Sequence, residues 1–311
     1  MLRGYAKRRF RVLRVLIVHM LLPIWFVALL KILGPQDTAT WFLVLISAAT
    51  YVAYISIAGS WSWFGIYLQR ALPVIMVAAA FITRPQFRAV NDSPQTAELR
   101  LLSLALAIWF LFLTARALLG RRAGRTALNL TFPLKDGKYL IAQGGASKVV
   151  NAHARNASQR YAVDIVKVGP MGTRAQGIYP IALKKYEIFG QQLVSPCDGV
   201  VVAARDDLPD LFPSEMDPQN PFGNHVAIQC EDATVYLAHL MKGSVTVEAG
   251  QRVRAGKILG RVGNSGNTTE PHLHVHAETG TYTGELSGQP AIRIRFGKRF
   301  LVRNDVVEAS E

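Results

Sequence analysis

The chain has 311 residues, enough for two domains, and combines a positive mean hydropathy of +0.19 with a formal net charge of +14. Much of the positive charge lies in 1–14 and 116–125, which flank apolar segments, and the chain contains no basic and aromatic motif of a nucleic-acid-binding domain. The composition therefore argues against a nucleic-acid partner. Apolar residues dominate 13–119, whereas 120–311 reads as an ordinary soluble sequence. We expect a membrane-embedded half followed by a soluble half.

The first apolar segment, 15–33, follows a cluster of basic residues: Arg3, Lys7, Arg8, Arg9, Arg11 and Arg14. This segment is too long for a signal-peptide core, and no small-residue cleavage site follows it, so we expect an uncleaved membrane span. Segments 41–58 and 101–119 are about as long as the hydrocarbon core of a bilayer requires and are predicted as further spans. Residues 1–119 are thus predicted to form a transmembrane region of three or four α-helices.

The segment 61–83 decides between three and four spans. It is apolar at both ends but contains Gln69, Arg70 and Pro73, so it fits either a full span or an interfacial segment. Because the basic N-terminus should stay in the cytoplasm, four spans would return the second half there and three would export it. We favour three, which gather several cations in one cytoplasmic loop: Arg70, Arg84, Arg88 and Arg100. The opposing evidence is the basic group after the last span: Arg121, Arg122 and Arg125.

A short basic linker, 120–130, leads to a predicted second domain at 131–311. Short strand-like runs alternate there with clusters of Gly, Pro, Asp and Asn. The runs are 139–142, 165–168, 192–194, 200–203, 225–229 and 234–238. No long amphipathic helical pattern follows residue 125. The second half is therefore predicted to be a mostly β domain.

The segment 245–267, VTVEAGQRVRAGKILGRVGNSGN, alternates apolar residues and has a glycine near every turn. This pattern is typical of tight hairpins that wrap a small barrel or sandwich. Biotinyl and lipoyl carrier domains have similar spacing, but they need a modifiable lysine at a hairpin tip flanked by methionine or aspartate. Lys257 lacks such neighbours. A carrier domain tethered to a membrane transporter is therefore the more distant interpretation.

Histidines and one carboxylate mark the candidate site. In the run PHLH at 271–274, His272 and His274 are two residues apart, so in a strand they point to the same face. His239 ends another strand-like run, YLAHL. Asp164 directly precedes the apolar run 165–168, where burial of a carboxylate is costly unless it binds a cation. These residue types predict a metal or catalytic site.

Together these segments resemble the lysostaphin-type, or LytM-like, zinc endopeptidases. The resemblance runs from about 133 to 278 and rests on four runs: GNHVAIQ (223–229), YLAHL (236–240), VEAGQRVRAGKILGRVGNSGN (247–267) and EPHLHVHAE (270–278). It implies a small β-barrel or sandwich with a core at about 133–285. It also implies that Asp164 and His274 are zinc ligands and that His239 and His272 are catalytic. His225 alternates with Val226 and Ile228 and is expected to face outward from its strand, whereas His276 would have a supporting role at most.

The third zinc ligand departs from the usual family pattern. That pattern, HxGxD, would place a histidine four residues before Asp164, where this chain has Arg160. Arginine stays protonated and has no lone pair for a metal. The sequence is similar to members of the family in which a displaced histidine precedes a QRYAxD segment. That resemblance implies His153 as the remaining ligand.

Two imidazoles and one carboxylate would leave a fourth position on Zn²⁺ for a water molecule, so the sequence predicts a zinc-dependent endopeptidase. The resemblance implies that the substrate is a peptide of bacterial peptidoglycan, and that the chain is a multi-pass protein of the bacterial plasma membrane with a periplasmic catalytic domain. The alternative is a catalytically inactive module that binds or activates another cell-wall hydrolase. Whether Cys197 and Cys230 pair stays open.

Overall fold

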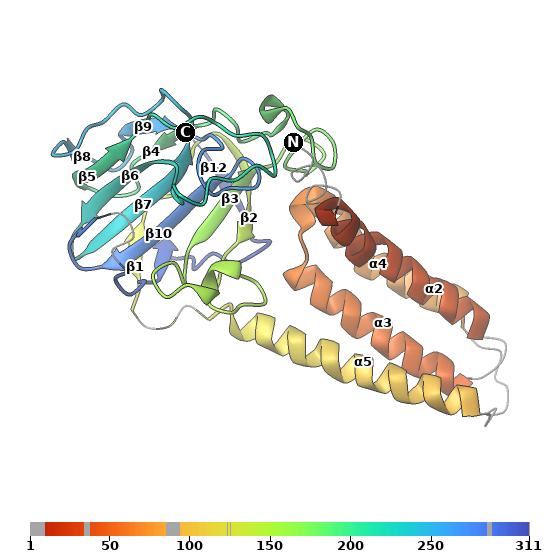
Figure 1. Ribbon diagram of the computed structural model, residues 1–311. Coiled ribbons are helices and arrows are strands. Elements are labelled where there is room, and N and C mark those ends of the chain that lie inside the picture. Colours follow the sequence, from red (N-terminus) through yellow and green to blue (C-terminus); the bar gives the residue numbers. More distant parts are fainter. Residues whose placement is uncertain are drawn as a thin grey trace.

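The computed structural model describes residues 10–33, 38–84, 94–122, 124, 126–284 and 288–310. Several basic residues named above lie outside these ranges: Arg3, Lys7, Arg8, Arg9, Arg88 and Arg125. Figure 1 shows two parts, a bundle of long helices and a domain built from strands and loops.

The helical part begins with a helix over Phe10–Ile32. It contains a π-helical turn, η1 (Ile17–Leu21), and continues as α2 (Leu22–Leu33). Pro23 accounts for the π turn, because proline has no N–H to donate to the carbonyl of His19. The remaining helices are α3 (Thr38–Ala58), η2 (Trp61–Trp63, a 3₁₀ turn), α4 (Ile66–Ile82) and α5 (Pro94–Leu119).

Phe10–Ile32, α3 and α5 are each long and apolar enough to cross a membrane, and α4 is a shorter apolar helix of 17 residues. Large apolar side chains project from the outer surface of the bundle, among them Ile24, Trp25, Phe42, Leu101 and Trp109. Such a surface is unusual for a protein in water and suits hydrocarbon. The helix α4 is part of the bundle, because it packs against α2 and α3, while α3 also packs along α5 (Figure 1).

Each helix of the bundle has one end against the β domain. Shared hydrophobic clusters join Val15 to Tyr179 and Tyr186, Ala58 and Ala117 to Val150, and Ile66 to Leu140 and Val166. These residues lie near the start of the first helix, the end of α3, the end of α5 and the start of α4, respectively. Within the described residues the chain therefore runs along the bundle four times, and the start of the first helix lies at the same end as the β domain.

This arrangement differs from the three-span expectation, in which 61–83 stays outside the bundle and the β domain lies opposite the N-terminus. Arg70 was expected to be costly in mid-membrane, but it is exposed and lies in the second turn of α4, next to the β domain. A cation at a helix end lies near the membrane boundary rather than at its centre. If the bundle spans a membrane, the first helix begins on the side that carries the β domain.

The second half is mostly β, as predicted. Its strands are β1 (Leu128–Leu130), β2 (Gly137–Gln143), β3 (Val163–Lys167), β4 (Gln192–Val194), β5 (Gly199–Arg205), β6 (Asn224–Cys230), β7 (Ala233–Leu240), β8 (Arg252–Val253), β9 (Ile258–Arg261), β10 (Leu273–Thr279), β11 (Ile294–Phe296) and β12 (Val306–Ala309). The main sheet has the order β12-β2-β3-β10-β7-β6-β5-β8, and β4-β9 and β1-β11 form two small sheets. The main sheet is open, with β12 and β8 at its edges, so the described residues form no closed barrel.

The two faces of the main sheet have different roles. Alternate residues such as Ile165, Val275 and Leu237 point to one face, where they pack with the small sheets in the main hydrophobic core. Because side chains alternate along a strand, Asp164 and His274 must point to the opposite face. The regular apolar alternation thus fixes both the core and the side of the sheet on which the polar residues gather.

Cys197 and Cys230 are joined by a disulfide, with their Cα atoms 6.2 Å apart. This separation is within the range that a disulfide requires. The bond links the loop after β4 to the end of β6, and Cys230 is part of the main core. It resolves the pairing that the sequence left open.

Candidate metal centre

The register between β3 and β10 brings Asp164 and His274 directly opposite each other. Cross-strand partners on one face of an antiparallel pair lie within reach of each other's side chains. The Nδ1–H of His274 donates to Oδ1 of Asp164 over 2.9 Å, and both side chains are buried. On the other side, His274 is opposite Ala238 of β7, whose small side chain leaves room above the sheet.

His153 reaches the same carboxylate from a short 3₁₀ helix, η3 (Ala152–Arg155). Asn151 caps this helix, because its side-chain oxygen accepts from the His153 backbone N–H while its amide group donates to the carbonyls of Gly145 and Ala162. The cap fixes the loop against the start of β3. The Nε2–H of His153 donates to Oδ2 of Asp164 over 2.9 Å.

Arg160, which stands at the usual ligand position, does not take part in this cluster. Its side chain is exposed, and its guanidinium lies 5.8 Å from the ring centre of Tyr161. The displaced His153 occupies the place beside Asp164 instead. The ligand atoms of His153, Asp164 and His274 all lie within 4.8 Å of one another. Two imidazoles and a carboxylate at such spacing fit a zinc site.

Burial and mutual contacts set the protonation of these groups. Burial acts to raise the pKa of Asp164, but neighbouring His153 and His272 and its hydrogen bonds hold that pKa well below the ordinary value. Burial lowers the pKa of His274 to about 3. Burial also acts to lower the pKa of His153, but the adjacent Asp164 carboxylate outweighs it and raises that pKa. An ionised carboxylate and a neutral His274 are the forms that bind zinc, and a bound cation would displace the His153 proton.

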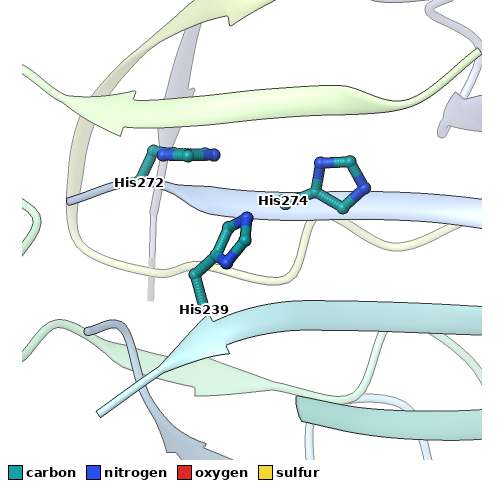
Figure 2. A group of neighbouring side chains, drawn as sticks. All are labelled: His239, His272 and His274. Atoms are coloured by element: carbon teal, nitrogen blue, oxygen red, sulfur yellow. The ribbon is translucent and has the colours of Figure 1, made fainter. Parts of the chain in front are cut away.

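Figure 2 shows His239, from β7, and His272, next to the start of β10, near His274. The ring centres of His239 and His272 are 4.8 Å apart, and those of His239 and His274 are 5.7 Å apart. The Nδ1–H of His239 donates to the carbonyl of Ser265, and that of His272 donates to the carbonyl of Glu270. In the neutral form of each ring, this hydrogen bond leaves the lone pair on Nε2. His239, His272 and His274 form a second group whose ligand atoms lie within 4.8 Å of one another.

His239 has an unusual backbone. Its φ is +66°, in the left-handed region that few residues other than glycine adopt, and its N–H donates to the carbonyl of Phe222. The strand β7 bends there and aims the ring at the cluster. Strained residues of this kind gather at functional sites.

His276 continues the polar face of β10 beyond His274. The Nδ1 of His276 lies 3.0 Å from Nε2 of His274, its ring stacks on Tyr236 at 4.5 Å, and its Nε2 lies 3.8 Å from Oε1 of Glu278. The sequence assigned His276 a supporting role but did not single out Glu278. The period of two along β10 would have found it, because Glu278 shares the face of His272, His274 and His276.

Comparison with known proteins bears on the β domain. Residues 183–285 match the model of peptidase family M23, and the resemblance drawn from the sequence is confirmed. The matched segment contains His239, His272 and His274, whereas His153 and Asp164 precede it. The pairing of β3 with β10 brings Asp164 to the site, and the 3₁₀ helix η3 brings His153 there.

Similar solved structures include a zinc-containing peptidase from Vibrio cholerae, 21% identical over 49% of this chain and 36% of that protein, with a TM-score of 0.30. This chain thus spans about a third of that protein's length. The catalytic domain of lysostaphin from Staphylococcus simulans is 21% identical over 38% of this chain and 83% of that domain, with a TM-score of 0.25. The catalytic domain of a prophage-encoded M23 protein from Enterococcus faecalis is 15% identical over 56% and 94%, with a TM-score of 0.29.

Proposed function

We propose that this protein is a zinc-dependent endopeptidase whose metal is bound by His153, Asp164 and His274. The observation that carries the proposal is the buried Asp164 carboxylate, which pairs with both imidazoles at 2.9 Å while two further histidines face it. A buried carboxylate between histidines is costly as a purely structural device but suits a dication. The M23 family match supports a peptidase.

His239 and His272 would carry the proton transfers. When bound, zinc polarises the scissile carbonyl and lowers the pKa of a water molecule. The free Nε2 of His239 or His272 accepts a hydrogen bond from the attacking water and takes its proton. The imidazolium then donates a hydrogen bond to the substrate oxygen as negative charge develops there, and it gives its proton to the amine nitrogen as the C–N bond breaks. The backbone carbonyls of Ser265 and Glu270 keep each ring in the required tautomer.

The substrate that we propose is a peptide of bacterial peptidoglycan, which follows from the family resemblance. The test uses the full chain purified in detergent. We expect about one zinc per chain by elemental analysis, release of new amino groups from purified peptidoglycan, loss of this release after chelation, and its return on adding zinc. Zinc far below one per chain would defeat the proposal. Bound zinc without cleavage of any wall peptide would instead support the inactive binding module.

The β domain is proposed to face the periplasm. The disulfide Cys197–Cys230 supports this location, since such bonds persist in oxidising compartments. Because the first helix begins at the same end of the bundle, the N-terminus would then also be exported. A reporter that is active only after export, fused before Met1 in one protein and after Glu311 in another, should be active in both.

One observation favours a second candidate function. Basic residues of the described chain gather at the domain end of the bundle: Arg11, Arg14, Arg70, Arg121 and Arg122. The positive-inside tendency would place this end in the cytoplasm. Inactive reporters at both termini would support that orientation, exclude polymeric peptidoglycan as substrate, and leave a peptidase acting on peptides at the cytoplasmic membrane surface.

A further inference from the structure

Arg303 joins the helical bundle to the loop that carries His153. Its guanidinium donates to the carbonyl of Ala58 at 3.1 Å, to the carbonyl of Val150 at 3.0 Å and to Oε1 of Gln143. Ala58 is the last residue of α3, where unpaired helix carbonyls carry partial negative charge. The same Gln143 oxygen accepts from the backbone N–H of Ala152, the residue before His153. One side chain thus ties a helix end to the residues that precede His153.

Asn304 strengthens this link. Its side-chain amide donates to the carbonyls of Ile57 and Gly59, at 3.0 and 2.9 Å. Together, Arg303 and Asn304 bind the last two carbonyls of α3, those of Ile57 and Ala58, and the carbonyl of Gly59 that follows. The helix end is therefore held rigidly against the segment that precedes β12.

A second link reaches the opposite side of the site. The Arg174 side chain is buried, with its guanidinium 4.1 Å from the ring centre of Trp63 in η2, and its backbone N–H donates to the carbonyl of Ser62. Arg174 also donates twice to the carboxylate of Glu270, at 2.9 and 2.6 Å. Paired bonds of this kind fix orientation as well as distance. The Glu270 carbonyl accepts the Nδ1–H of His272.

Tyr179 repeats this connection. Its ring stacks on Trp63 at 5.1 Å, and its hydroxyl donates to the carbonyl of Thr269 over 2.6 Å. Trp63 therefore supports Thr269 and Glu270, which lead directly into His272. The two links leave from different parts of the bundle and end on different sides of the site, one at a proposed ligand and the other at a proposed catalytic residue.

We propose that the helical bundle is a working part of the metal centre: Arg303 positions His153 for the metal, and Trp63, acting through Arg174 and Glu270, positions His272 for the substrate. The inference rests on the proposed function. It assigns the membrane region a role beyond anchoring, because any shift of α3 or η2 relative to the β domain reaches the site. Arg303 and Trp63 touch neither substrate nor metal and are positioning residues.

The first test replaces Arg303 in the full chain. Arg303→Met keeps most of the side-chain length but removes all three bonds, and we expect the zinc dissociation constant to rise about ten- to hundredfold. Arg303→Lys keeps the charge and reaches fewer acceptors, so its effect should be intermediate. The control is Arg299→Met, which removes an exposed arginine side chain that donates to the carbonyl of Val306 within the β domain. Affinity is measured by competition with a chromophoric chelator, which requires no turnover.

The second test replaces Trp63. Trp63→Leu should leave zinc affinity unchanged and lower kcat about ten- to hundredfold, because His272 is not a ligand but loses its support. Trp63→Phe keeps an aromatic face under Arg174 and should restore most of kcat. The control is Trp109→Leu, which removes an exposed tryptophan from the outer surface of α5.

The two readouts separate this inference from a general loss of stability. Partial unfolding would lower both zinc affinity and kcat in each variant. A positioning role predicts instead that Arg303→Met lowers zinc affinity and that Trp63→Leu lowers kcat alone. Unchanged affinity in Arg303→Met, or full rescue by lysine, would overturn the first link. If Arg303→Met does not fold, Asn304→Ala replaces it. We expect a smaller loss of zinc affinity in that variant, and an unchanged affinity would overturn the link. A wild-type chain without zinc would instead overturn the proposed function itself.

Discussion

Two groups of side chains share His274 and differ in charge. His153, Asp164 and His274 are joined by hydrogen bonds to one buried carboxylate, whereas His239, His272 and His274 contain only imidazoles. Two of those imidazoles donate Nδ1–H to backbone carbonyls, which fixes the orientation of each ring. Because a buried dication needs a compensating charge, the group with Asp164 should bind the metal. The other group should serve the substrate.

Removing the shared histidine or the carboxylate should have the largest effect. His274→Ala and Asp164→Ala are each expected to abolish zinc binding, the first because it removes a ligand common to both groups, the second because it removes the only charge. Elemental analysis of the purified full chain should find almost no zinc in either variant, with no turnover. Full zinc occupancy in Asp164→Ala would contradict this assignment and would indicate that the all-histidine group binds the metal.

The second prediction concerns His153, the displaced ligand. His153→Ala should lose zinc, because no other described donor lies in its place beside Oδ2 of Asp164. Arg160→Ala is the matched control and should keep zinc, since the Arg160 side chain is exposed and carries no lone pair for a metal. Both are measured by zinc content and chelator competition. A zinc-loaded His153→Ala protein would point to a different third ligand.

The second group is tested by separating binding from turnover. His239→Ala and His272→Ala should retain zinc and lower kcat by about 10²–10⁴-fold, the range for loss of a general acid or base. Zinc content and peptide hydrolysis are followed on the same preparations. An empty site in His239→Ala would show that this histidine is a ligand and that the two groups have the opposite roles.

The β domain was largely predictable because local patterns determine its elements. The alternation in 271–274 placed His272 and His274 on one face, and the predicted strands recur as β2, β3, β4, β5, β6 and β7 with shifts of up to two residues at their ends. The register that brings Asp164 opposite His274 joins positions 110 residues apart. No local pattern encodes such a pairing, so the sequence indicated that these residues belong together only through the family resemblance.

The helical region was less predictable. Hydropathy found the three long helices, but the segment containing Arg70 was ambiguous because sequence alone does not show whether a cation lies at the middle or the end of a helix. The contacts of Arg303 with Ala58 and of Arg174 with Trp63 join residues far apart in the chain. A buried arginine has no sequence signature, since its partners are carbonyls and a ring that any neighbouring segment can supply.

The smallest effect is expected at His276, which tests how far the metal-binding group extends. Nε2 of His274 lies 3.0 Å from Nδ1 of His276, and a hydrogen bond between them would orient the His274 ring for the metal. His276→Leu removes that hydrogen bond and should weaken zinc binding about tenfold, the lower end for a residue that orients a metal ligand. His276→Asn offers an oxygen close to the position of Nδ1 and should retain most of the affinity. Equal affinities for the wild type and both variants would show that Asp164 and the fold alone orient His274. Equal losses in both variants would instead attribute the effect to the lost stacking of His276 on Tyr236.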